Sequence, residues 1–199
     1  MIPPARRAAA FAFPALPLLA SLLFAPLPVR ADDALAKIDD AKAALGAKQA
    51  TKAYLALSNA VSELASRTPL FLTAGALVDG PSRGYGQYTT RPHNVYTRNQ
   101  PIQVYVEPAG FDHGRKAGGL YTVSLACDYQ ILDSKGKIVT ADRVVKEVEI
   151  VSRQANAELG VDIALPLLDL PKGDYTLEIQ VRDQIANDSA RVKLPFKMQ

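Results

Sequence analysis

The chain of 199 residues contains one cysteine, no tryptophan and two histidines. A single cysteine excludes an intrachain disulfide, so the fold has to be held together by packing alone. The two histidines, His93 and His113, form no H-x-H or H-x-x-x-H pair, which argues against a catalytic zinc site. The sequence also lacks a P-loop, a dinucleotide-binding glycine motif and a recognisable pair of catalytic carboxylates. We therefore expect no cofactor.

Residues 1–31 have the character of a secretory leader. A short basic start precedes a nearly unbroken apolar run over 8–29, and the run ends in Val29-Arg30-Ala31, which fits the small-residue rule for signal-peptide cleavage. A retained membrane anchor is the alternative, because about 22 apolar residues can span a bilayer. Four prolines within the run argue against it, since they break a spanning helix. We expect a periplasmic or secreted protein without a stable membrane span once the leader is removed.

The net charge of the chain after residue 31 argues against nucleic acid as a partner. Residues 1–31 contain Arg6, Arg7 and Arg30 and no acidic residue, so their removal leaves 20 basic residues against 20 acidic ones. A formally neutral chain has no net electrostatic attraction to nucleic acid, and we expect no nucleic-acid partner. The residues that remain are enough for one ordinary domain with a small appendage.

Residues 32–69 are predicted to form a helical hairpin. Apolar residues recur at spacings of three and four in two segments, with Gly46 as a stop signal between them and Pro69 as a barrier after the second. Each helix is short enough to be marginal alone, so the two have to pair. The apolar stripes expected to do this are Ala34, Ile38, Ala41 and Leu45 in the first helix and Tyr54, Leu57, Val61 and Leu64 in the second.

Residues 70–199 show the two-residue alternation that is typical of half-buried strands. The clearest strand is 121–131, where Cys127 falls on the inward face between Leu125 and Tyr129, and a turn at 133–137 follows it. No helix-sized gap separates the strands. We predict a mainly β fold, in which the helical hairpin precedes an antiparallel immunoglobulin-like β-sandwich of about seven strands.

Two segments resemble known proteins. Leu170, Gly173 and Tyr175 in "LPKGDYTLEIQV" resemble the corner that opens the penultimate strand of immunoglobulin and fibronectin type III domains. That resemblance implies a tyrosine hydroxyl bonded back to nearby backbone, and it implies architecture without function. The stretch "NQPIQVYVEPAGF" is similar to a segment of exported bacterial proteins that begin with helices.

Two motifs suggest chemistry, and each has a simpler interpretation. Gly80 to Gly84 match G-x-S-x-G with Ser82 in the nucleophile position, but the residues that follow cannot start the helix that a nucleophile elbow requires. A metal site would have to combine His93 and His113 with acidic residues such as Glu107, Asp112 or Asp128. We expect Ser82 to lie in an ordinary loop and both histidines to be solvated.

The segment "GYGQYTTRPHNVY", residues 84–96, concentrates aromatic and polar side chains between the helical and β parts. Its tyrosines suit a seam between the hairpin and the sandwich, because they can cover apolar surface while their hydroxyls stay wet. The alternative is an exposed recognition surface for a peptide, a glycan or an envelope protein. The candidate residues are Tyr85, Tyr88, Arg91, His93, Asn94 and Tyr96.

Together these observations predict an exported, non-enzymatic envelope protein that acts as a binding or structural accessory. A hydrolase that uses Ser82 and a periplasmic metal-binding protein are the two alternatives.

Overall fold

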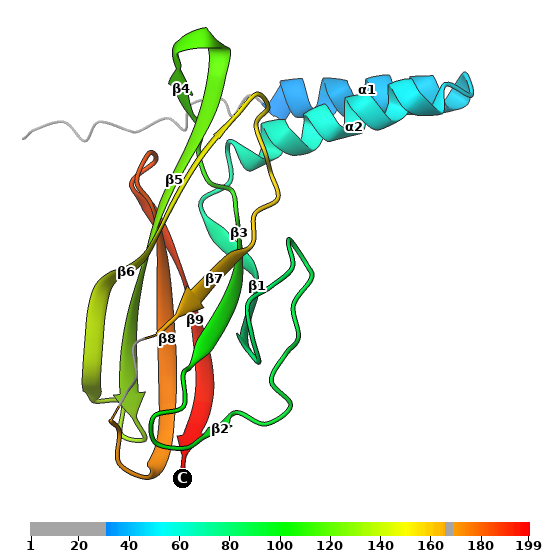
Figure 1. Ribbon diagram of the computed structural model, residues 1–199. Coiled ribbons are helices and arrows are strands. Elements are labelled where there is room, and N and C mark those ends of the chain that lie inside the picture. Colours follow the sequence, from blue (N-terminus) through cyan, green and yellow to red (C-terminus); the bar gives the residue numbers. More distant parts are fainter. Residues whose placement is uncertain (1–30, 166–168) are drawn as a thin grey trace, which may run out of the picture.

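A computed structural model describes residues 31–165 and 169–199, and it shows a helical hairpin followed by two layers of β-sheet (Figure 1). The expected leader lies outside the described residues. The predicted mainly β fold is confirmed, and the hairpin projects sideways from one end of the sandwich. The elements are α1 (Ala31–Gly46), α2 (Ala50–Ala65), β1 (Phe71–Val78), β2 (Val95–Tyr96), β3 (Gln103–Ala109), β4 (Gly114–Lys116), a 3-10 turn (Ala117–Gly119), β5 (Leu120–Asp133), β6 (Ile138–Ser152), β7 (Val161–Ala164), β8 (Gly173–Asp183) and β9 (Asp188–Met198).

The strands form one small and one large sheet. The small sheet has the order β1-β3-β7, and the large sheet has the order β2-β9-β8-β5-β4, with β6 on the other edge of β5. Among the described residues every pairing between these strands is antiparallel except that of β2, which runs parallel to the end of β9. This exception lies where the chain enters the large sheet after a long connection from β1.

The core lies between the two sheets and is built from the predicted alternation. Cys127 is fully buried within this core, and burial raises the pKa of its thiol to about 12. The thiol is therefore protonated and inert near neutral pH, as its inward position indicates. Most of the expected inward side chains of β3, β5, β7, β8 and β9 are in this core, including Val104, Val106, Leu125, Ile131, Ile163, Leu177, Ile179, Leu194 and Phe196. Tyr121 at the start of β5 is an exception, because it is half-buried and lines the cleft beside the helical hairpin.

The tyrosine corner is present at the start of β8. The Tyr175 hydroxyl donates a hydrogen bond of 2.9 Å to the carbonyl oxygen of Pro171, four residues upstream. The Tyr175 ring also stacks on Phe196, at 5.6 Å between ring centroids. The corner therefore ties the connection before β8 to the core.

The helical hairpin packs through alanines and not through the larger apolar residues of the predicted stripes. Ala34, Ala41 and Ala44 of α1 and Ala53 and Ala60 of α2 are buried. Small side chains let the two helix axes approach closely, and this leaves the larger residues outside the contact. The predicted stripe of α2 is exposed, since the side chains of Tyr54, Leu57, Val61 and Leu64 all lie at the surface.

Tyr175→Phe should lower the free energy of unfolding by about 0.5–1.5 kcal/mol, because it removes one hydrogen bond and keeps the ring. Urea unfolding followed by circular dichroism measures the change. Tyr129→Phe is the control, because the Tyr129 hydroxyl makes no hydrogen bond within the part of the chain that the structure describes. Equal losses in the two variants would contradict a stabilising corner.

Candidate functional site

The connection between β1 and β2, residues 79–94, lies over the outer face of the small sheet and is named the 79–94 loop here (Figure 1). It contains most of the tyrosine-rich segment. Along β3, Val104 and Val106 point into the core, so Tyr105 and Glu107 point away from it. Both outward side chains are nevertheless buried, because the loop covers them. The loop is therefore packed against the sandwich.

Ser82 fixes the first part of the loop to β7. Its backbone N–H donates to Asp162 Oδ1 at 2.9 Å, and its hydroxyl donates to Asp162 Oδ2 at 2.7 Å. A bend and turn follow Ser82 where a nucleophile elbow would have a helix. The serine of the G-x-S-x-G match thus bonds directly to a carboxylate and holds the loop in place.

Gly86 fixes the tip of the loop to β3. Its N–H donates to the Tyr105 hydroxyl at 2.8 Å and to Glu107 Oε1 at 3.1 Å, while the Tyr105 hydroxyl donates to the same carboxylate oxygen at 2.9 Å. Gly86 has φ of +69°, a conformation that favours glycine. The Tyr88 ring stacks on the Tyr105 ring at 4.2 Å between centroids. Burial raises the pKa of Tyr105 to about 12, so its hydroxyl stays a donor.

Arg91 holds the end of the loop. Its guanidinium donates to Asp79 Oδ1 at 2.8 Å and to the Val95 carbonyl at 3.1 Å, and it lies 4.4 Å from the centroid of the Tyr96 ring. Tyr96 is fully buried and makes an edge contact with Phe196. Tyr96 therefore belongs to the core and is not part of an exposed surface, and half-buried Arg91 is engaged on three sides.

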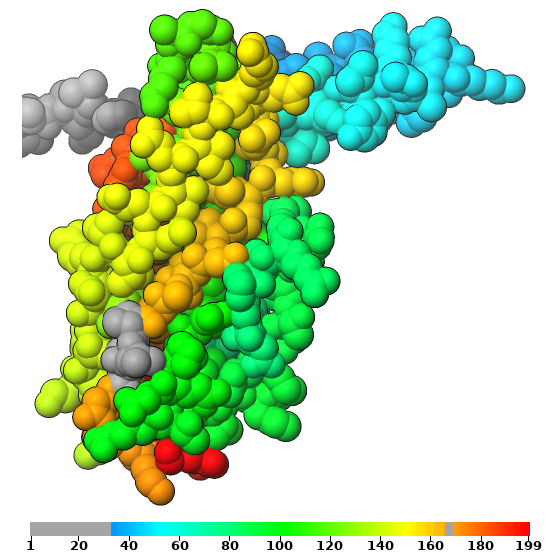
Figure 2. Space-filling model, viewed as in Figure 1, coloured from blue at the N-terminus to red at the C-terminus, as the bar shows by residue number. Residues whose placement is uncertain are grey.

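The side chains that the loop leaves at the surface differ in part from the predicted set. Tyr85, His93 and Asn94 are exposed, and the Asn94 side-chain amide donates to the Pro195 carbonyl at 3.1 Å. Tyr88 is half-buried on Tyr105. Arg83 and Gln87 are exposed beside Tyr85, and sequence reasoning missed them because nothing in the sequence reveals how the loop tip folds back on itself. Figure 2 shows the loop as a raised strip along one side of the sandwich.

The seam between the hairpin and the sandwich lies elsewhere. A cleft of about 350 Å³ separates the end of the hairpin from β4, β5 and the connection that follows β6. Its walls include Lys37 and Glu63 from the helices and His113, Arg115 and Tyr121 from the sandwich. The prediction that the tyrosines of 84–96 line this seam is wrong, because the 79–94 loop attaches to the outer face of the small sheet instead.

The two histidines occupy separate surroundings. His113 packs near Phe111 and Tyr121, and its Nε2 atom lies 3.1 Å from the Asn156 carbonyl oxygen. His93 is exposed in the 79–94 loop. Within residues 31–165 and 169–199 no three side chains of the His, Cys, Asp and Glu types are grouped as metal ligands.

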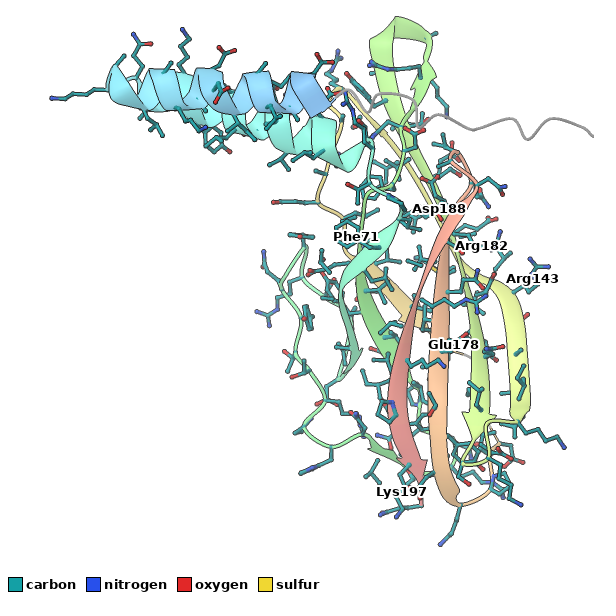
Figure 3. All side chains as sticks on the ribbon, turned by 180° about the vertical axis from the view of Figure 1, so that it is seen from behind. Phe71, Arg143, Glu178, Arg182, Asp188 and Lys197 are labelled. Atoms are coloured by element: carbon teal, nitrogen blue, oxygen red, sulfur yellow. The ribbon has the colours of Figure 1, made fainter. Side chains whose placement is uncertain are left out.

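A second polar surface covers the outer face of the large sheet, where a shallow cleft of about 270 Å³ is lined by charged residues. Figure 3 labels Glu178 and Arg182 along β8 and Arg143 on β6. Arg182 donates two hydrogen bonds to Asp128, at 2.7 and 3.1 Å, and Glu178 lies 3.4 Å from Arg191. These acidic and basic side chains form ion pairs with one another, so they leave little net charge on this face.

Asp128 also holds a bulge in β6. Its Oδ1 atom accepts the N–H of Val144, which has φ of +57°, unusual for a branched residue. The hydrogen bonds from Arg182 keep the pKa of the Asp128 carboxyl below its ordinary value, against the opposing effect of burial. The ionised carboxylate of Asp128 therefore stabilises the bulged backbone of the edge strand β6.

No family model matches this sequence, and no curated protein matches it. Solved structures with a similar arrangement include a Niemann-Pick type C2 protein from the Japanese carpenter ant, with 10% identity and a TM-score of 0.41 over 66% of this chain and 94% of that one. Spo0M, a sporulation control protein from Bacillus subtilis, has 12% identity and a TM-score of 0.36 over 66% of this chain and 50% of that one.

The CARDB domain of the PF1109 protein from Pyrococcus furiosus has 12% identity and a TM-score of 0.30, over 66% of this chain and 86% of that one. Similarities at these values do not bear on what this chain binds, and its fold is assigned from its own strand pairing.

Among the described residues no helix is both long and apolar enough to cross a bilayer.

Asp162→Ala should release the first part of the loop and make the Arg83–Gly84 bond at least about tenfold more susceptible to trypsin. The reason is that hydrogen bonds to a charged group contribute roughly 1.5–3 kcal/mol, and about 1.4 kcal/mol corresponds to a factor of ten. Limited proteolysis followed by mass spectrometry measures cleavage at this bond. Asp169→Ala, which removes an exposed ion pair with Arg98, is the control. Unchanged cleavage in Asp162→Ala would show that Ser82 does not hold the loop.

Acid should weaken the large sheet through Asp128. An unfolded aspartate titrates near pH 3.9, and the folded carboxyl titrates lower. Its stabilising contribution is therefore present above about pH 4 and is lost as the pH falls through the folded pKa. We expect Asp128→Asn to be less stable than wild type at neutral pH and to lose less stability than wild type between about pH 7 and pH 3. Urea unfolding at both pH values is the measurement, and an equal loss in the two proteins would argue against this role.

Proposed function

We propose that the chain is an exported, non-enzymatic accessory protein of the cell envelope that binds a protein or peptide through the exposed side of the 79–94 loop. The observation that carries this proposal is a loop fixed at three places that still presents Arg83, Tyr85, Gln87 and His93 to solvent. Binding residues are often found on loops that a rigid scaffold positions.

The residue types on this surface suit protein recognition. Tyrosine and arginine are enriched among the residues that contribute most to binding energy at protein interfaces. Because the loop is already held by Ser82, Gly86 and Arg91, little conformational entropy has to be lost when a partner binds. The exposed side chains vary in chemistry, with a cation, an aromatic ring, an amide and an imidazole, which favours a mixed polar and apolar partner.

The same contacts support a non-enzymatic role. The groups that resemble catalytic residues have structural partners, since Ser82 donates to Asp162 and Tyr105 donates to Glu107. The only thiol is buried and protonated. The apolar run within residues 1–31 supports export, and residues 32–199, which are formally neutral and have a single cysteine, are compatible with the periplasm.

Tyr85→Ala should weaken capture of the partner by at least about tenfold, because a central aromatic at an interface contributes more than about 1 kcal/mol. The immobilised protein is incubated with a solubilised envelope fraction, and retained proteins are quantified by mass spectrometry. A photo-reactive amino acid at position 85 then identifies the protein that it contacts.

Ile138→Ala is the control, because Ile138 is a large exposed side chain on β6, outside the 79–94 loop and the helical hairpin. Equal retention by Tyr85→Ala and wild type would contradict the assignment of the surface. Ester or peptide hydrolysis by wild type that disappears in Ser82→Ala would instead support the hydrolase alternative.

A further inference from the structure

The helical hairpin leaves its larger apolar side chains uncovered on one face, named the hairpin face here. Tyr54 is 70% exposed, Leu45 58% and Val61 57%. Residues of this size are normally buried when they recur at helical spacing. The exposed members of the hairpin face are Leu35 and Leu45 of α1 and Tyr54, Leu57, Val61 and Leu64 of α2, and half-buried Ile38 lies on the same side of α1.

The two helices contribute to the same side of the hairpin. On each helix an apolar residue directly follows a buried alanine, as Leu35 follows Ala34 and Tyr54 follows Ala53. One residue turns the helix by about 100°, so each stripe lies beside the alanine contact in the same rotational sense. Because the helices run antiparallel, equal rotations bring both stripes to one side. The hairpin face is therefore continuous across α1 and α2.

The sandwich does not cover this face. The helical residues that line the cleft toward the sandwich are mainly polar and include Lys37, Asn59, Ser62 and Glu63. Lys37 and Glu63 form an ion pair of 2.9 Å there. The hairpin thus turns its polar side toward β4 and β5, and the apolar side chains point elsewhere. Figure 1 shows most of the hairpin projecting beyond the sandwich.

The size of the hairpin face matches a protein–protein contact. A helix of 16 residues is roughly 24 Å long, and two packed helices are about 20 Å wide, so the face covers on the order of 480 Å². Two such faces in contact bury on the order of 1,000 Å², which is about the lower limit for a specific interface.

The charges around the face favour a second copy over a lipid surface. Residues 33–67 carry four acidic and five basic side chains, so the hairpin lacks the cationic excess of helices that lie on anionic membranes. Within the face the neighbouring cation Lys42 is paired with Asp39 at 3.0 Å. A nearly neutral apolar surface can meet its own copy without like-charge repulsion, as an isologous interface requires.

We propose that the hairpin face is a homodimer interface, at which two hairpins pack face to face into a four-helix bundle. In this arrangement Tyr54, Leu57, Val61 and Leu64 of one copy contact the equivalent residues of the other. The contact is independent of the 79–94 loop, so the dimer and the partner surface can be tested separately.

Leu57→Glu and Leu55→Glu form a matched pair, because both leucines lie at the surface of α2 but on different sides of it. Leu57 belongs to the hairpin face, and Leu55, which is 56% exposed, points about 160° away from it. Sedimentation velocity of the full protein between about 1 and 100 μM should show a dimer for wild type and for Leu55→Glu. Leu57→Glu should raise the dissociation constant at least tenfold, because it buries a charge at the contact.

Val61→Glu provides a second disruption at another position of the face and should also dissociate the dimer. Circular dichroism of each variant shows whether the hairpin is still helical, so a folded monomer is distinguished from an unfolded one. A monomeric wild type at about 100 μM, or equal dissociation of Leu55→Glu and Leu57→Glu, would overturn the proposal.

Flotation of wild type with phosphatidylcholine vesicles that Leu57→Glu abolishes would assign the face to lipid instead. Tyr85→Ala should leave the dimer intact.

Discussion

The structure depends on the burial of alternating side chains between two sheets that no disulfide links. The chain has one cysteine and no tryptophan, so neither a disulfide nor a large indole is available to hold the layers together. Medium-sized residues such as Val104, Leu125 and Leu177 fill the space instead, and each contributes about 1.5–3 kcal/mol when it is fully buried. Cys127 takes part as one more small apolar residue.

The small sheet adds a second layer of burial on its outer side. Tyr105 and Glu107 point away from the core and would be solvated on a bare strand, but the 79–94 loop covers them. β3 is therefore buried on both faces, which is unusual for a strand of an antiparallel sandwich with one solvated side. Under the loop tip the Gly86 N–H, the Tyr105 hydroxyl and the Glu107 carboxylate satisfy one another. The buried Arg91 Nε and Gln103 Oε1 atoms have no hydrogen-bond partner within the part of the chain that the structure describes.

The sequence was sufficient to predict the parts of the fold that local periodicity determines. The alternation from Val123 to Ile131 identified the central strand and its inward face, and Tyr175 indicated the corner before β8. The helical period identified α1 and α2, but it could not say which apolar residues pair, because alanine and leucine satisfy the same spacing. Only the three-dimensional packing shows that Ala53 and Ala60 form the contact while Leu57 lies outside it.

The candidate site was predictable in composition and not in arrangement. Ser82 pairs with a residue 80 positions away, and Gly86 pairs with residues on β3, so no local pattern could indicate these contacts. Because these anchors lie on β3 and β7, the loop is held in this form only when both strands are in place. A nascent or partly unfolded chain would lack the surface that Arg83 and Tyr85 present. A partner that binds this surface would therefore bind the folded protein and not the unfolded chain.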